Sequence, residues 1–300
     1  MSPTPQPRAT AVSVVVVSYQ SEADLAMCLG SLERAAGQHP LEVVVVDNAS
    51  SDGSVEIARG YGVKVIENAS NEGLPKAVNA GVAATAAPWL LFANPDTWLS
   101  PGSLARLLAT AARDQRIGCV GPHLAYPDGS DYPTGRRFPS LLMGAAHAAL
   151  GAVWPGNPAT RSYHMAGVDR SQPLEVDWVS GACMLVRRSA FEAVGGFDPG
   201  YFMYFEDIDL CLRLARLGWE VVFDPSAEVK HVVGGSTRSA PYRKVVNHHR
   251  SALRFYRRRY ARDPRLVLLP VVAAFLAVRA LLSFGRVALT QRRERRTAAG

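Results

Sequence analysis

The chain has 300 residues, of which 48% are hydrophobic and 20% are charged. This composition supports a sizeable core and excludes a wholly disordered, collagen-like or disulfide-stapled chain, while the length fits two domains or one large α/β domain with attachments. The net charge of +7 is uneven, because residues 1–242 carry a net −6 and residues 243–300 a net +13. A basic tail of this kind suits an anionic membrane surface or a nucleic acid.

Neither the cysteines nor the amino terminus indicates export. The four cysteines are far apart and form no CxxC pair, which argues against a zinc ribbon or redox motif and favours reduced thiols in the cytoplasm: Cys28, Cys119, Cys183 and Cys211. Residues 1–11 are polar and Pro-rich and lack the apolar segment of a signal peptide. We expect them to be disordered.

Strands alternate with helices in the first part of the chain. Apolar, β-branched runs predict strands at 12–19, 42–47, 63–67, 89–93 and 117–121, and helices lie between them at 21–36, 52–59, 75–86 and 100–112. This alternation predicts an α/β fold with a single Rossmann-like, mostly parallel sheet flanked by helices. Residues 12–124 would form its first half.

The periodicity fades over residues 125–173, where Pro, Gly, Ser and Tyr are frequent. We expect a mobile excursion there, with one short apolar helix near 141–153. Order returns in a second half, residues 174–240, with a strand-like stretch at 175–187, a helix at 206–217 and short strands at 221–224 and 228–232.

Residues 241–300 are predicted to form a basic helical tail that associates with a membrane. A basic helix at 242–260 precedes an apolar stretch, 266–289, that is interrupted by Pro270, Arg279 and Arg286. Its longest uncharged run has 13 residues, whereas a membrane span needs roughly 20. The two arginines are seven residues apart and share one helical face, so we expect an amphipathic segment that lies on the bilayer rather than crossing it.

Two polar loops begin where predicted strands end, the first starting at Asp47 and the second spanning residues 94–96 (NPD). Ligands of open α/β sheets bind at this carboxyl edge. The usual glycine cradles for dinucleotides and triphosphates, GxGxxG and Walker A, are absent from the sequence. A carboxylate-bound metal would be another means of holding phosphates, because Mg²⁺ takes one or two carboxylates together with phosphate oxygens.

Six motifs in this order resemble the family-2 glycosyltransferases with a GT-A fold. They are residues 14–19 (VVVVSY), 45–53 (VVDNASSDG), 71–73 (NEG) and 94–96 (NPD), followed by 178–182 (WVSGA) and 205–213 (FEDIDLCLR). The last two, with Lys230 and His231, are similar to the rhamnosyltransferase branch. The resemblance covers about residues 12–260.

The resemblance implies a role for each motif residue. Donor-binding residues would be Ser18, Asp47, Asn48, Asn71, Gly73, Asn94 and Asp96. Asp96 and His231 would hold the metal, Mg²⁺ or Mn²⁺. Asp207 would be the catalytic base, with Glu206 as its helper, and Trp178 and Gly181 would line the acceptor side.

Several of these residues also have purely structural interpretations. Asp47 could cap a turn, and acidic residues in a first helical turn are favourable without any catalytic role. Asn94 stands where the family commonly has an aspartate, which puts strict metal dependence in doubt. Arg136 and Arg137 could clamp a diphosphate or be solvated. Arg257, Arg258 and Arg259 suit membrane contact better than a solvated helix face.

The implied reaction is inverting transfer of L-rhamnose from dTDP-β-L-rhamnose to N-acetylglucosamine on a polyprenyl diphosphate, at the cytoplasmic face of the membrane, in cell-wall linker synthesis. One alternative is a sister enzyme that uses a UDP-hexose, UDP-galactofuranose or GDP-mannose. A sugar nucleotidylyltransferase fits less well, since the first strand runs into SYQS instead of a Gly-rich stretch. The apolar run 266–278 argues against nucleic acid as partner, and a non-catalytic nucleotide-sugar-binding protein would not need Asp96, Asp207 and His231 together.

Overall fold

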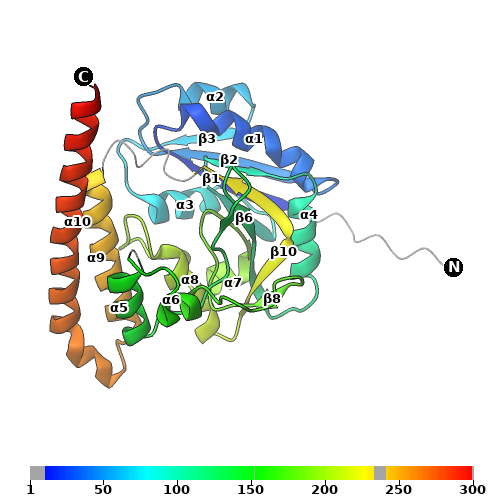
Figure 1. Cartoon of the computed structure of the whole chain (residues 1–300). Coiled ribbons are helices and arrows are strands. Elements are labelled where there is room, and N and C mark those ends of the chain that lie inside the picture. The colour runs from blue at the N-terminus through cyan, green and yellow to red at the C-terminus, as the bar shows by residue number, and fades with distance from the viewer. Residues whose placement is uncertain (1–10, 152, 233–240, 299–300) are drawn as a thin grey trace.

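The computed structural model describes residues 11–151, 153–232 and 241–298, with side chains to Arg292. The prediction of a disordered amino terminus therefore falls almost wholly outside the described residues. One ten-stranded sheet organises the molecule (Figure 1). Its strands follow the order β3 (Lys64–Glu67), β2 (Leu41–Asp47), β1 (Val12–Ser18), β4 (Trp89–Ala93), β9 (Cys183–Arg187), β6 (Ile117–Ala125), β10 (Glu220–His231) and β5 (Thr97–Leu99), with β7 (Asp131–Tyr132) beside β6 and β8 (Leu174–Glu175) beside β10.

The sheet is mixed, and its two parallel parts are joined by an antiparallel strand. β3, β2, β1 and β4 run parallel, and β10 runs parallel to β6. β9 lies between β4 and β6 and is antiparallel to both. The predicted single sheet is confirmed, and β9 brings the second half of the chain into its centre.

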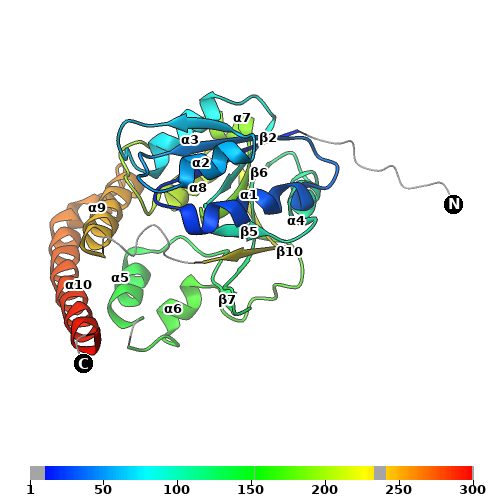
Figure 2. The ribbon, with the colours of Figure 1, turned by 90° about the horizontal axis from the view of Figure 1, so that it is seen from above.

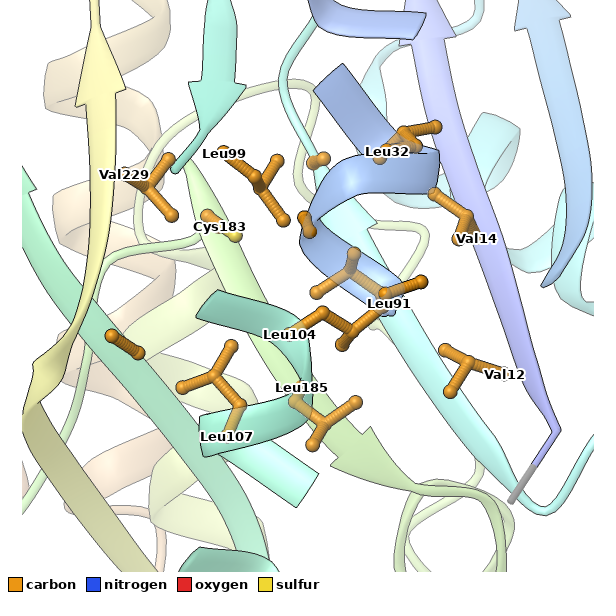
Figure 3. Packing of buried hydrophobic residues seen from close by; sticks show 14 of the residues in the cluster. Val12, Val14, Leu32, Leu91, Leu99, Leu104, Leu107, Cys183, Leu185 and Val229 are labelled. Atoms are coloured by element: carbon orange, nitrogen blue, oxygen red, sulfur yellow. The ribbon is translucent and has the colours of Figure 1, made fainter. Parts of the chain in front are cut away.

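Helices cover both faces of the sheet. One face carries α1 (Glu22–Ala36), α2 (Ser54–Gly60) and α4 (Ser103–Ala111), and the other carries α3 (Leu74–Ala83), α7 (Arg188–Ala193) and α8 (Glu206–Arg216). Alternate residues of β1 point to opposite faces, so that Val14 packs with the first group and Val15 with the second. Figure 3 shows the first group, in which Leu32 and Leu104 meet side chains of the sheet. All four cysteines are buried as free thiols.

The second half differs in detail from the predicted elements. The two short strands predicted at 221–224 and 228–232 are one strand, β10, because the chain continues through an irregularity in its pairing with β6 between Asp224 and Glu228. Of the strand-like stretch predicted at 175–187, only Glu175 in β8 and Cys183–Arg187 in β9 are strand, and the residues between them have only an isolated bridge at Trp178. The short elements β5, β7 and α7 were not predicted. In the excursion, α5 (Leu141–Leu150) matches the predicted helix, and α6 (Pro158–Tyr163) is an additional helix.

The tail forms a helical hairpin on one side of the molecule (Figures 1 and 2). α9 (Pro241–Arg259) is followed by a short 3₁₀ helix, η1 (Pro264–Leu268), and by α10 (Leu269–Ala298). The start of α9 packs against the later part of α10, where the rings of Tyr242 and Phe284 are 5.8 Å apart. In the described part of the chain, one helical segment, Pro264–Arg292, is long and apolar enough to cross a membrane.

The arginine run at 257–259 does not form a membrane-facing group. Arg257 is exposed, but Arg258 lies 3.0 Å from both Asp198 and Asp209. The guanidinium of Arg259 lies over the ring of Phe138. Two of the three arginines therefore fasten α9 to the body of the protein, because buried carboxylates there need a positive partner.

Candidate active site

A cleft of about 420 Å³ opens at the carboxyl edge of the sheet. Most of the predicted site residues line it, namely Asn48, Asn71, Gly73, Asn94, Asp96, Trp178, Gly181, Glu206, Asp207 and His231. Ser18 and Asp47 are not among its lining residues. Arg136 lines the cleft, whereas Arg137 does not. The strand order brings together residues more than 150 positions apart in the chain.

Asp47 is the last residue of β2 and is buried next to the cleft. Its carboxylate is buried and accepts hydrogen bonds from the Ser50 backbone N–H at 2.8 Å and the Ser50 hydroxyl at 2.6 Å. Ser18, at the end of the adjacent strand, is also buried, and its hydroxyl has no hydrogen-bond partner among the described residues. Binding of a nucleotide base by either side chain remains a prediction.

The loop that ends at Gly73 is tied to the loop after β2. The Asn48 amide oxygen accepts a hydrogen bond from Asn68 at 2.8 Å, and the Asn71 side chain accepts one from the Gly73 backbone N–H at 3.1 Å. Gly73 has a φ of 87°, and a Cβ there would lie 2.6 Å from the Phe202 carbonyl oxygen. Only glycine fits this position without strain.

Asp96 and His231 form a pair of possible metal ligands. Asp96 follows β4 and His231 ends β10, and the Val232 backbone N–H donates to the Asp96 carbonyl at 2.9 Å. The Asp96 carboxylate and His231 Nε2 are 3.2 Å apart, and His231 Nδ1 is buried with no partner among the described residues. No third protein ligand joins them in the part of the chain that is described. The two side chains therefore suit a metal whose other ligands are phosphate or water oxygens.

Asp207 is held at the start of α8 with its carboxylate fixed by the backbone. Its two oxygens accept hydrogen bonds from the N–H groups of Gly181 at 2.9 Å and Ile208 at 2.8 Å. Burial raises the pKa of the Asp207 carboxyl, and these hydrogen bonds and the Arg136 charge oppose that rise. Gly181 is constrained by this contact, because a Cβ there would lie 3.1 Å from the Asp207 Cβ.

Glu206 differs from Asp207 in that one of its carboxyl oxygens receives no hydrogen bond from the described residues. This oxygen, Oε2, is buried. Burial raises the pKa of the Glu206 carboxyl to about 8, and the neighbouring Asp207 charge adds to the rise. Two neighbouring carboxylates resist carrying charge in one buried site, and the hydrogen bonds from the Gly181 and Ile208 N–H groups favour placing the charge on Asp207 and the proton on Glu206.

Glu206→Gln is expected to stabilise the fold increasingly as the pH rises from about 4.5 to 8. The unfolded chain releases the Glu206 proton near 4.5 and the folded chain near 8, so the native stability of the parent protein falls across this window. The variant should gain on the order of 2 kcal/mol at pH 7. Urea unfolding at several pH values measures this difference in the free energy of unfolding. Glu56→Gln, which changes an exposed side chain of α2, is the control. A pH-independent difference would contradict the raised pKa.

Trp178 forms part of a wall around Arg136 rather than an open face for stacking. The Arg136 guanidinium lies 4.7 Å from the Trp178 ring centre and also approaches the rings of Tyr132 and Tyr163. The Trp178 indole N–H donates to the Arg137 carbonyl at 3.1 Å. Both side chains line the cleft, so a group bound on this side would meet the Arg136 charge together with the indole.

Two sets of cleft residues escaped the sequence analysis. The first comprises the aromatic residues of the excursion, Tyr132 and Tyr163. The second comes from the first turns of α9 and consists of Arg243, Lys244, Asn247 and His248. The Arg-Lys pair at the start of a basic helix was a usable signal. The sequence does not predict that this pair lies beside the cleft, because its position depends on how α9 packs on the rest of the protein.

The sequence is similar to known proteins over most of its length. Residues 13–195 match the family model described as glycosyl transferase family 2. The chain is 40% identical over 284 residues to a Mycobacterium tuberculosis protein described as N-acetylglucosaminyl-diphospho-decaprenol L-rhamnosyltransferase, covering 90% of this chain and 91% of that one.

Solved structures share the fold at low sequence identity. A mannosyltransferase from Pyrobaculum calidifontis, in complex with GDP-Man and Mn²⁺, superposes with a TM-score of 0.53 and 18% identity over 95% of this chain and 80% of that one. GalNAc-T7 with UDP, GalNAc and Mn²⁺ gives a TM-score of 0.57 and 18% identity over 75% of this chain and 44% of that one. The chain has a GT-A fold and belongs to glycosyl transferase family 2.

Proposed function

We propose that this glycosyltransferase moves L-rhamnose from dTDP-β-L-rhamnose to N-acetylglucosamine carried on a polyprenyl diphosphate, with inversion, as a step in cell-wall linker synthesis. The observation that carries the proposal is the Asp207 carboxylate, fixed by two backbone N–H groups in a cleft that also contains Asp96 and His231. The 40% identity to the mycobacterial rhamnosyltransferase, over nearly the whole of both chains, supports the donor sugar and the acceptor.

In the proposed reaction Asp207 accepts the proton of an acceptor hydroxyl. The hydroxyl oxygen forms a bond to the anomeric carbon of rhamnose, and the bond from that carbon to the nucleotide diphosphate breaks. One displacement converts a β donor into an α-rhamnoside and needs no covalent enzyme intermediate. The backbone donors keep Asp207 oriented toward the cleft, and Glu206, neutral at pH 7, avoids a second negative charge beside the base.

The chemistry of Asp96 and His231 fits a divalent metal, Mg²⁺ or Mn²⁺. A carboxylate oxygen and an imidazole nitrogen lie 3.2 Å apart in the cleft, and two structural neighbours contain Mn²⁺. Such an ion, when bound, neutralises charge that develops on a departing diphosphate. Asn94 lies two positions before Asp96 and has no charge, so this loop supplies a single carboxylate.

Asp96→Ala is expected to weaken metal-dependent binding of dTDP by about 10–100-fold, because one of two protein ligands is lost. Calorimetric titration of dTDP with Mg²⁺, and again with a chelator, measures the effect. The parent protein should lose affinity on chelation, and the variant should respond little. Asp128→Ala, which changes an exposed carboxylate outside the cleft, is the control. Equal chelator sensitivity of both variants would remove Asp96 from the metal site.

We further propose that the protein lies at the cytoplasmic face of the membrane, held there by its tail. α10 packs along α9, which contains seven Arg and Lys residues and no Asp or Glu. If α10 crossed the bilayer, it would carry α9 and these charges toward the hydrocarbon, at a cost of ~2.5–3.5 kcal/mol for each charge at the centre. A helix lying on the surface avoids this cost and leaves exposed basic residues of α9, such as Arg250 and Arg257, near anionic headgroups.

Deletion of residues 262–300 is expected to shift the protein from the membrane fraction to the supernatant. The deletion removes the apolar surface of α10 and eight arginines. Sedimentation with vesicles that contain phosphatidylglycerol measures binding, and the folded state of the truncated chain is checked by its circular dichroism. Sedimentation equal to that of the full chain would contradict anchoring by the tail.

Nucleotide release from a panel of sugar nucleotides, with Mg²⁺ and with or without N-acetylglucosaminyl-diphospho-lipid, tests the whole proposal. Release from dTDP-rhamnose that depends on this acceptor is the expected result. Release from a UDP-hexose, UDP-galactofuranose or GDP-mannose would keep the mechanism and replace the donor. Absence of nucleotide release with every donor, together with no nucleotide binding in calorimetry, would overturn the proposal.

A further inference from the structure

α5 is an apolar helix in which Leu142, Ala149 and Leu150 are exposed and the other residues are half-buried. Its sequence, LLMGAAHAAL, contains no Asp, Glu, Lys or Arg, and none of its residues is buried. Leu142 is 82% exposed, and just beyond the helix Val153 and Trp154 are 73% and 56% exposed. Large apolar side chains this exposed, gathered on one short segment, are typical of an interaction surface.

α5 lies beside the tail hairpin, as Figures 1 and 2 both show. The contact is made by Arg279 of α10, whose guanidinium donates to the Ala148 carbonyl at 3.2 Å and lies 3.4 Å from His249 of α9. Arg279 is thus turned toward α5 and α9. The residues of α10 that stay exposed include Val271, Val278, Leu281, Leu282 and Leu289. α5 and α10 together offer an apolar surface from segments more than 100 residues apart.

The surroundings of this surface are positively charged. No Asp or Glu occurs between Asp131 and Asp169, and none occurs in α9. Arg243 and Lys244 are exposed at the start of α9, and both line the cleft. Apolar side chains beside basic ones, with an exposed tryptophan, are typical of a surface that inserts among anionic lipid headgroups.

We propose that α5, with Val153 and Trp154, is a second membrane-contacting element that rests with α10 on an anionic bilayer. The contact places the cleft mouth, with Arg243 and Lys244, at the level of the headgroups. There a lipid-linked diphosphate would reach the cleft without leaving the bilayer. This use of the contact rests on the proposed function, whereas the contact itself is measured without any transferase reaction.

Quenching of tryptophan fluorescence by brominated lipid tests the contact on the full chain. Vesicles of phosphatidylglycerol with phosphatidylcholine brominated on its acyl chains quench only indoles that enter the bilayer. Trp154 is the one strongly exposed tryptophan of the five, since Trp89 and Trp178 are buried and Trp98 and Trp219 are half-buried. We expect quenching in the parent protein, its loss in Trp154→Phe and its retention in Trp219→Phe. Quenching that persists in Trp154→Phe would overturn the proposal.

A charge placed on α5 gives a second, independent measurement. Leu142→Glu should lower the vesicle partition coefficient about tenfold, because a carboxylate resists entry among anionic headgroups. Met27→Glu is the matched control, since Met27 is 49% exposed on α1, away from the hairpin, and should leave the coefficient unchanged. Equal effects of the two variants would overturn the proposal. So would a lipid-free dimer that Leu142→Glu dissociates, since a second copy would then cover α5.

These outcomes are separable from those of the proposed function. If no donor supports transfer but Trp154 is quenched, the rhamnosyltransferase assignment fails and the membrane surface stands. If transfer from dTDP-rhamnose occurs but Trp154 is not quenched, the enzyme assignment stands and α5 is not a membrane element.

Discussion

Asp207→Asn is expected to lower kcat by about 10²–10⁴-fold, the usual contribution of a general base. The amide has nearly the shape of the carboxylate, and its oxygen can still accept the hydrogen bond from the Gly181 N–H. Its nitrogen cannot accept the one from the Ile208 N–H, a loss of about 1 kcal/mol that removal of the buried charge offsets. What it loses is the capacity to take a proton. Because the loss falls on the chemical step, affinity for dTDP-rhamnose should remain near that of the parent protein.

Three measurements together identify the role of Asp207. Calorimetry should find unchanged nucleotide binding, and thermal unfolding should find a similar or higher melting temperature, because a buried charge is removed. The kcat of the parent protein should fall as the pH drops through the raised pKa of the Asp207 carboxyl. Turnover of the variant within a few-fold of the parent would remove Asp207 from its role. Glu206→Gln, which keeps the base, is the neighbouring comparison.

Asp209→Ala is expected to lower the free energy of unfolding by ~3–5 kcal/mol, although Asp209 is only two residues from the proposed base, Asp207. The Asp209 carboxylate is fully buried and lies 2.7 Å from Arg213 and 3.0 Å from Arg258. Arg213 also donates to the carbonyls of Val194 and Gly196. Removing the carboxylate leaves a largely buried guanidinium without its counter-charge and frees α9 from one of its attachments to α8.

Urea unfolding of the two aspartate variants separates the base from the structural carboxylate. Asp209→Ala should shift the midpoint strongly, whereas Asp207→Asn should not. Asp114→Ala is a suitable control, because its partner Arg116 is on the surface and that pair should contribute little. An unchanged midpoint for Asp209→Ala would mean that Arg213 and Arg258 find other partners. A loss of activity at full stability would show that Asp209 belongs to the reaction.

The two ion pairs of Asp209 illustrate which contacts the sequence could predict. The pairing of Asp209 with Arg213 follows from their spacing of four on a helix, and the structure contains it. The pairing with Arg258, 49 residues away, does not follow from any local pattern. For the same reason the arginine run 257–259 was interpreted as a membrane contact, whereas Arg258 turns inward to Asp198 and Asp209.

The residues of the cleft likewise include some that local patterns predict and others that only tertiary packing brings there. Motifs at the ends of β2 and β4 and at the start of α8 predicted the residues that meet there, because parallel strands share a carboxyl edge. The enclosure of Arg136 by three aromatic rings and the approach of Arg243 and Lys244 were not foreseeable. Each depends on a packing between segments that the intervening sequence does not specify.

The sequence by itself determined the βα alternation, the strands of the first half and the positions of most cleft residues, since each is written in a local pattern of apolar and polar residues. It also determined that the last 58 residues are basic and apolar. Only the tertiary structure decided that β9 enters the centre of the sheet antiparallel, that Trp178 lies against Arg136, and that α5 joins α10 beside the cleft. These are contacts between distant segments, and their free energy arises from burial and pairing that form only when the chain has folded.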